Sequence, residues 1–176
     1  MRTALSIAGV AIFVLTAAGT ALAQGSGAEA RLKQLNITVP ADQAPAANFV
    51  NSVQAGKLLF LSGNTPGGQW PLKGKVGKDL TVEQGYESAR QTGLIMLGKI
   101  RTALGSLDRV KRVVKVLGMV NSADGFSDQP KVVNGFSDLM VEVFGEAVGK
   151  HARSAVGMAG LPGNAPIEVE MIVEVE

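Results

Sequence analysis

Runs of apolar residues predict five strands along this chain. A short run at 49–53 and a nearly continuous apolar run at 57–63 flank an Ala-Gly turn, an arrangement that predicts a hairpin. A run that is apolar at almost every position is typical of a strand covered on both faces. The β-branched run at 112–122 predicts a third strand, and the runs at about 153–159 and 166–175 predict the last two.

Two other segments carry an apolar residue every three or four positions, and each predicts a long amphipathic helix. The first begins at Thr81, where Gln84 completes a capping box, and ends at Gly105; the second ends at Gly145. Three glycines inside the first helix would each cost up to about 1 kcal/mol relative to alanine, so we expect this helix to pack closely onto a sheet. These glycines are Gly85, Gly93 and Gly98.

The order of these elements predicts an α+β fold. Because the two helices are interleaved with strands, the simplest layout is one mixed sheet with both helices on one face. A single helical layer leaves the other face of the sheet uncovered, yet the strands carry apolar residues on both sides. We therefore expect that face to be buried against another copy of the chain, in a homo-oligomer.

The first residues have the pattern of a secretory signal peptide. Arg2 is followed by an apolar stretch at about 4–18, and small residues at 21–23 form an A-x-A cleavage site. We therefore expect cleavage after Ala23 and a periplasmic or secreted protein. The alternative is an uncleaved membrane anchor, although the apolar stretch is shorter than the ~20 residues that a membrane-spanning helix needs.

This expectation divides the chain into three parts. Residues 1–23 form the signal peptide, and residues 24–44 form a polar linker with a short helix that breaks at Pro40. Residues 45–176 form one domain, which is long enough to bury a core. No later segment is apolar enough to span a bilayer, so we expect no membrane contact after cleavage.

Composition excludes several classes of chemistry. The 17 Lys and Arg residues nearly balance the 15 Asp and Glu residues, so no strong basic field is available for nucleic acid. The absence of cysteine excludes disulfides, a thiol nucleophile and a thiolate zinc site, and a single histidine excludes a histidine-rich metal centre.

The candidate chemical groups lie near the end of the chain, in the stretch HARSAVGMAGLPGNAPIEVEMIVEVE (151–176). Arg153 stands at the start of a strand, and Glu168 and Glu170 alternate so that they share one face of the next. One interpretation is a cross-strand ion pair, worth about 0–1 kcal/mol if exposed. The other is a pocket in which Arg153 binds a substrate carboxylate and Glu168 holds or activates a water.

Three further features have simpler interpretations. The Gly- and Lys-rich loop at 64–79 fails as a phosphate loop, because its glycine spacing is wrong and Val76 occupies the position that needs Ser or Thr. Trp70 in this loop either packs or covers a pocket. His151 is interpreted as a surface residue, because no G-x-S-x-G turn marks a nucleophile for it.

Three motifs in order resemble the RidA/YjgF family of reactive-intermediate imine/enamine deaminases, also labelled endoribonuclease L-PSP-like. The stretch 151–176 resembles its A-R-S-x-V strand, Leu-Pro turn and closing V/I-E-V/I-E strand. LLFLSGNTPG (58–67) and VVNGFSDLMVEVFG (132–145) resemble its early S-G segment and its helix. The similarity covers roughly 45–176. It implies a chorismate-mutase-like α+β fold, assembled as a homotrimer with pockets between subunits.

The resemblance also implies residue roles. Arg153 falls on the arginine that binds the substrate carboxylate, and Glu168 falls on the catalytic glutamate linked to the hydrolytic water. Gly63 and Asn134 fall on residues that line the substrate pocket. The implied reaction is hydrolysis of 2-imino acids, formed from enamines, to 2-oxoacids and ammonia. It requires no metal or organic cofactor, and the implied partner is a small carboxylate.

The chain departs from the family pattern at the pocket. Ala155 stands where the family has a cysteine, and Phe49, which cannot donate a hydrogen bond, falls on its tyrosine. Asn64 replaces the usual glutamine. These changes indicate a diverged, exported branch, so a non-catalytic trimer that binds small carboxylates is the alternative. The ribonuclease label is disfavoured by the near-neutral charge and the single histidine.

Overall fold

A computed structural model describes residues 27–45 and 47–176 of the chain. The predicted signal peptide, residues 1–23, lies outside this part. In chain order the elements are α1 (Ala28–Gln34), β1 (Ser52–Ala55), β2 (Leu58–Asn64), α2 (Val82–Leu104), η1 (Leu107–Arg109), β3 (Val110–Asn121), α3 (Gln129–Phe144), α4 (Glu146–Gly149), β4 (Ala152–Met158), η2 (Pro162–Asn164) and β5 (Ile167–Val175).

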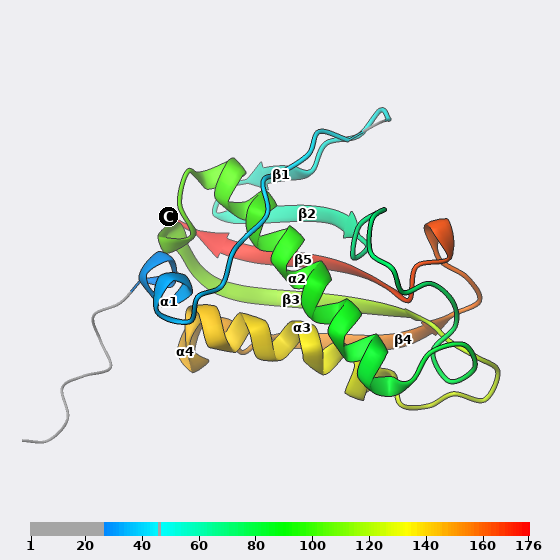
Figure 1. The fold of residues 1–176 in the computed structure, drawn as a ribbon. Helices are drawn as coiled ribbons and strands as arrows, with labels where there is room; N and C mark the ends of the chain where they lie inside the picture. Colours follow the sequence, from blue (N-terminus) through cyan, green and yellow to red (C-terminus); the bar gives the residue numbers. More distant parts are fainter. Residues whose placement is uncertain (1–26, 46) are drawn as a thin grey trace, which may run out of the picture.

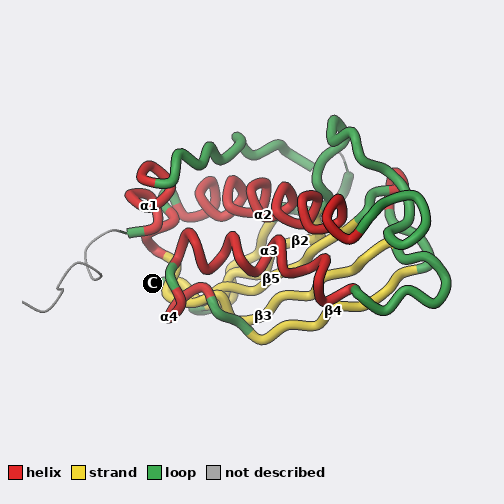
Figure 2. Tube along the Cα trace, turned by 60° about the horizontal axis from the view of Figure 1, so that its bottom comes forward, coloured by secondary structure: helices red, strands yellow, loops and turns green. Residues whose placement is uncertain are grey.

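The five strands form one mixed sheet in the order β1-β2-β5-β3-β4 (Figure 1). β4 runs parallel to β3, which is possible because α3 makes the crossover between them, and the other three pairings are antiparallel. Figure 2 shows α2 and α3 side by side over the same face of the sheet. The predicted single sheet with two helices on one face is confirmed.

Alternation along β5 shows how the sheet separates its two faces. Every second residue from Ile167 to Val175 is buried beneath the helices, and the residues between them face the other way. Phe60 on β2 and Val156 on β4 also point to this second face and are 41% and 40% exposed. We call it the open face, and its exposed apolar side chains agree with the predicted apolar character of both sides.

α2 begins and ends as its sequence predicts. The Thr81 hydroxyl accepts from the Gln84 N–H, the Gln84 side chain accepts from the Thr81 N–H, and Gly105 ends the helix with a left-handed φ of 81°. The glycines inside α2, however, do not pack on the sheet. Gly93 lies against Leu139 of α3, and a side chain at Gly98 would collide with the backbone carbonyl of Pro40. The predicted packing partner was therefore wrong, because a glycine indicates close approach without saying to what.

The segment at 35–43, which we call the N-terminal strap, crosses α2 at Gly98 (Figure 1). α1 precedes it and adds Ala28 and Leu32 to the hydrophobic core, so the predicted linker is already helical from Ala28. The carboxylate of Glu29 accepts two hydrogen bonds from Arg101 and so attaches α1 to α2. Through these contacts, α1 and the strap pack against α2 and form part of the folded domain.

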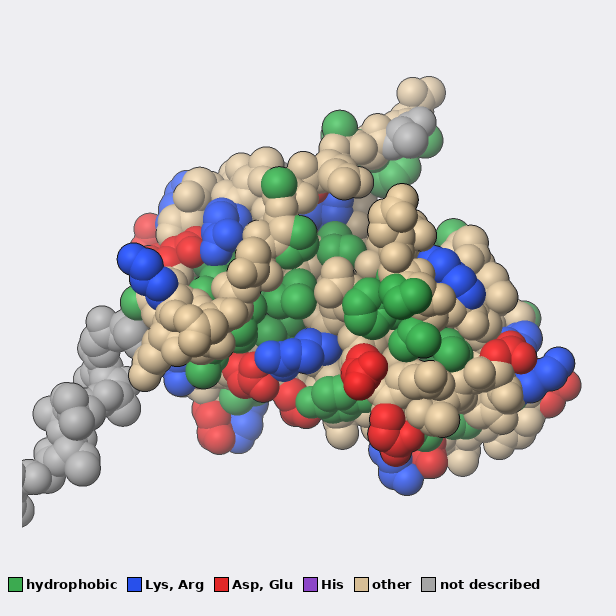
Figure 3. Space-filling view, viewed as in Figure 1, with side chains coloured by type: hydrophobic (Ala, Val, Ile, Leu, Met, Phe, Trp, Pro, Cys, Tyr) green, Lys and Arg blue, Asp and Glu red, His purple; other side chains and the backbone are tan. Residues whose placement is uncertain are grey.

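Figure 3 shows the helical face with acidic and basic side chains interspersed, as the near balance of charges in the sequence leads one to expect. Within the residues that the structure describes, no helix has both the length and the apolar composition needed to cross a bilayer.

Candidate functional site

The guanidinium of Arg153 is held by neutral acceptors on α3. Its Nη1 donates to Asn134 Oδ1 at 2.8 Å and to Ser137 Oγ at 3.0 Å, and its Nη2 lies 3.4 Å from the Pro130 carbonyl oxygen. Among the described residues, no carboxylate forms an ion pair with Arg153. The positive charge is thus positioned by hydrogen bonds but not neutralised, which suits the binding of an anion.

His151 supports this arrangement from behind. Its Nδ1 lies 2.7 Å from the Gly149 carbonyl oxygen, which can only accept, so Nδ1 donates. Nε2 lies 3.1 Å from Ser137 Oγ and, in the neutral ring, accepts the hydroxyl proton. Burial lowers the pKa of His151; the bond to Gly149 opposes this, and the charge of Arg153 lowers it further. A neutral ring therefore orients Ser137 so that its lone pair faces Arg153.

The interpretation of His151 as a surface residue was wrong. The ring is half-buried and makes two hydrogen bonds. Ser137 was missed altogether, because it is one of several polar residues on α3 and nothing in its local sequence marks it. The only available signal was that the motif at 132–145 and the motif around Arg153 both carry polar residues.

The carboxylate of Glu168 lies on the open face, against the backbone of β2. A side chain at Gly63 would collide with it, so glycine at this position is what allows the close approach. Burial raises the pKa of Glu168, and the charge of Glu170 on the same face raises it further. A carboxyl group with a raised pKa can exchange a proton more readily near neutral pH, as general acid–base chemistry requires.

Arg153 and Glu168 are not brought together within one protomer. β3 lies between their strands, with Val116 paired to Arg153 and Met119 paired to Glu168. Val116 is buried beneath the helices, whereas Met119, three residues on, points to the open face. The two groups are therefore on opposite faces, separated by roughly 10 Å along the strands and about 10 Å across them. A cross-strand ion pair between them, one of the two interpretations, is excluded.

The other predicted site residues divide in the same way. Asn134 binds Arg153 directly, and Ala155 lies on the helical side of β4, where it packs against the core. Phe49, 54% exposed, lines a shallow hollow of about 420 Å³ on the open face, together with Glu170.

We name the two groups by their charged members. The arginine half-site consists of Arg153, Asn134, Ser137, His151 and Ala155. The glutamate half-site consists of Glu168, Glu170, Gly63 and Phe49. Within the described part of the chain, no cluster of three or more His, Asp or Glu residues is arranged to hold a metal ion.

Comparison with known proteins identifies relatives over most of the chain. Residues 21–175 match the family model described as "YjgF/chorismate_mutase-like, putative endoribonuclease". Protein TCP17 of Trypanosoma cruzi is 48% identical over 149 residues, which cover 82% of this chain and 92% of that protein.

Two solved structures are similar in fold and sequence. Protein Atu1372 from Agrobacterium tumefaciens, described as of unknown function, is 40% identical with a TM-score of 0.76, covering 84% of this chain and 91% of that one. A protein from Shewanella oneidensis described as a "putative endoribonuclease" is 30% identical with a TM-score of 0.80, covering 85% of this chain and 100% of that one.

Proposed function

The chain belongs to the YjgF/endoribonuclease L-PSP family, and we propose that within it the protein is a RidA-like hydrolytic deaminase of reactive 2-imino or enamine acids. The products are 2-oxoacids and ammonia. E. coli TdcF, which shares the fold at 21% identity and a TM-score of 0.55, has been crystallised with bound serine, so one protein of this fold holds a small amino acid.

The observation that carries the proposal is the uncompensated charge of Arg153. Three neutral acceptors hold the guanidinium in place, and none of them is an anion. A carboxylate can form two parallel hydrogen bonds with such a planar fork. The arginine half-site is therefore suited to the α-carboxylate of an imino acid, and its binding would place the neighbouring imine carbon at a fixed distance.

A complete active site needs a second copy of the chain. Because Arg153 and Glu168 face opposite sides of the sheet, one protomer presents only one half of the chemistry at any surface. The open face carries exposed apolar residues such as Phe60 and Val156, whose burial would drive association. We propose a homotrimer in which the glutamate half-site of one protomer meets the arginine half-site of the next.

In this site the reaction uses water and one proton carrier. Glu168 removes a proton from water as the water oxygen forms a bond to the imine carbon, and the C=N electron pair moves to nitrogen. Glu168 then donates the proton to that nitrogen. Glu168 next takes the proton of the new hydroxyl group and passes it to the amino nitrogen. The O–H electron pair forms the carbonyl bond of the 2-oxoacid, the C–N bond breaks, and ammonia leaves. Arg153 keeps the carboxylate in position throughout.

The test is ammonia release from enzymatically generated 2-imino acids. Arg153→Ala should abolish it, because the substrate loses its anchor. Arg90→Ala is the matched control: it also removes one arginine charge, but from a partly exposed ion pair with Glu142 on the helical face. Equal rates for wild type and Arg153→Ala would overturn the proposal.

A non-catalytic carboxylate binder is the second candidate. Ala155 and Phe49 favour it, because neither side chain can donate a hydrogen bond to a substrate or to water. Calorimetry with 2-oxoacids separates the two functions. Binding without ammonia release supports the binder, and absence of binding to any 2-oxoacid contradicts both. We also propose export through the signal peptide at 1–23, which predicts a mature chain that begins at Gln24 by mass spectrometry.

A further inference from the structure

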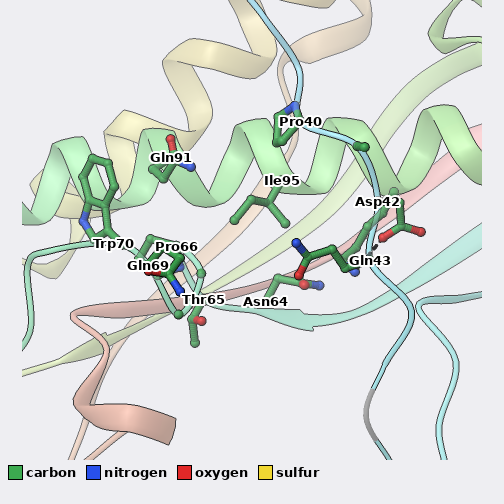
Figure 4. Close-up of a pocket in the computed structure, with 14 residues that line it drawn as sticks. Pro40, Asp42, Gln43, Asn64, Thr65, Pro66, Gln69, Trp70, Gln91 and Ile95 are labelled. Carbon is green, nitrogen blue, oxygen red and sulfur yellow. Dashed lines mark hydrogen bonds and ion pairs between the residues drawn. The ribbon is translucent and has the colours of Figure 1, made fainter.

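A cavity of about 450 Å³ lies between the N-terminal strap, the loop at 64–70 and α2 (Figure 4). Its volume is in the range of ligand sites in proteins, roughly 300–1,000 Å³. Pro66, Trp70 and Ile95 provide apolar surface. The side-chain amides of Gln43 and Asn64 lie close together below Ile95 in Figure 4, one from the strap and one from the end of β2.

This cavity is separate from both half-sites. Asn64 is paired with Val169, which is buried beneath the helices, so the cavity lies on the helical side of β2. Glu168 lies on the opposite side of the sheet. Arg153 is on β4, and two strands, β5 and β3, lie between β2 and β4. None of the residues that line the cavity belongs to either half-site.

The charged groups in the cavity wall compensate each other. Lys99 Nζ lies 2.9 Å from Asp42 Oδ1, and their side chains are only 7% and 13% exposed. Asn51 Nδ2 donates to both oxygens of Asp42, at 3.0 and 3.1 Å. A charged ligand would therefore lose its hydration without gaining a counterion, which is unfavourable. The cavity is suited to a neutral ligand.

Apart from the hydroxyl of Thr65, the remaining polar side chains of the cavity wall are amides. The side chains of Gln43, Gln69 and Gln91 make no hydrogen bond to another residue of the described chain. Each amide offers both donors and an acceptor, as does each hydroxyl of a sugar. The apolar C–H surface of a sugar would lie against Trp70 and Ile95. We propose that this cavity binds a neutral polyhydroxylated molecule of the size of a mono- or disaccharide.

Trp70 makes the proposal directly measurable. It is the single tryptophan of the chain, and its indole N–H donates to Ser88 Oγ at 2.9 Å, so the ring is fixed at the cavity wall. The structure thus joins both interpretations of Trp70, since the ring packs and also lines a pocket. Any change in tryptophan fluorescence on addition of a ligand must come from this residue.

The experiment titrates the full chain with D-glucose, D-galactose and maltose while Trp70 fluorescence is recorded. At least one sugar should give a saturable change. Gluconate, the charged counterpart of glucose, should bind more weakly. Gln91→Leu should weaken the sugar about five- to tenfold, because it removes hydrogen bonds to the ligand. Gln34→Leu is the matched control, since Gln34 is exposed on α1, away from the cavity.

Three results would overturn the proposal. The first is no saturable change with any of the sugars at tens of millimolar, and the second is stronger binding of gluconate than of glucose. The third is unchanged sugar affinity in Gln91→Leu, with Gln43→Leu tested in parallel in case either variant fails to fold. Glucose, galactose and maltose carry no carboxylate for Arg153, so their binding does not depend on whether the chain deaminates imino acids.

Discussion

Ser137 is the residue whose removal tests the arginine half-site most directly. Its hydroxyl accepts from Arg153 at 3.0 Å and donates to His151 at 3.1 Å in the neutral-ring arrangement. A hydrogen bond to a charged group contributes about 1.5–3 kcal/mol and a neutral one about 0.5–1.5 kcal/mol. Both partners keep other hydrogen bonds and some access to water. We therefore expect Ser137→Ala to lower the free energy of unfolding by only about 1–2 kcal/mol.

The effect on ligand binding follows from the mobility of Arg153. Without Ser137 the guanidinium keeps its bonds to Asn134 and Pro130 but loses the one that His151 orients. In the variant the Arg153 side chain is more mobile before binding. Immobilising it when the ligand binds costs roughly 0.5–1.5 kcal/mol. The affinity for a 2-oxoacid should therefore fall about two- to tenfold. In the deamination assay KM should rise while kcat changes little, because Ser137 does not contact the water.

The assay pairs isothermal calorimetry against pyruvate with urea unfolding at fixed protein concentration, because association contributes to apparent stability. Ser137→Thr retains a hydroxyl and should recover most of the affinity. Ser127→Ala is the control, because Ser127 is exposed and its hydroxyl has no hydrogen-bond partner in the described part of the chain. The reasoning is refuted if Ser137→Ala binds pyruvate as tightly as wild type, or if Ser127→Ala weakens binding to the same extent.

Two further predictions concern the glutamate half-site and the open face. Because the folded pKa of Glu168 is raised above its ordinary value of 4.5, its stabilising contribution is complete below that pH and is lost as the pH rises through the raised value. Glu168→Gln should therefore unfold at a higher urea concentration than wild type at pH 7 but not at pH 4, and equal stability at pH 7 contradicts the raised pKa. The same variant should release ammonia at least about a hundredfold more slowly. Phe60→Glu should convert the proposed trimer to monomers in light scattering, whereas Lys57→Glu should not. A wild-type monomer refutes the shared site.

The helices and strands could be predicted because their signals are local. The capping box of Thr81 and Gln84 and the alternation of residues in β5 each involve neighbours within a few positions. The same holds for the pairing of Glu168 and Glu170 on one face, which follows from the two-residue period of a strand. Phe49, by contrast, lies before β1 and not inside it, because strand ends are weakly specified by sequence.

The contacts that join distant segments could not be predicted. His151 was interpreted as a surface residue because its partner Ser137 lies 14 positions earlier, on α3, and only the crossover from β3 to β4 brings them together. Gly98 signalled a close approach, but its partner Pro40 belongs to a strap nearly 60 residues upstream. The cavity beside Trp70 likewise needs three separate segments to form.

By itself the sequence determined the secondary structure and the family, and it singled out the two charged groups of the proposed site, because each depends on residue type and short-range period. Tertiary structure decided how those groups are arranged. Insertion of β3 between β4 and β5 separates Arg153 from Glu168 across the sheet, and the register of the two strands on β3 places them on opposite faces. Strand order depends on long-range pairing and on which faces can be buried, and neither is encoded in the spacing of residues along one strand.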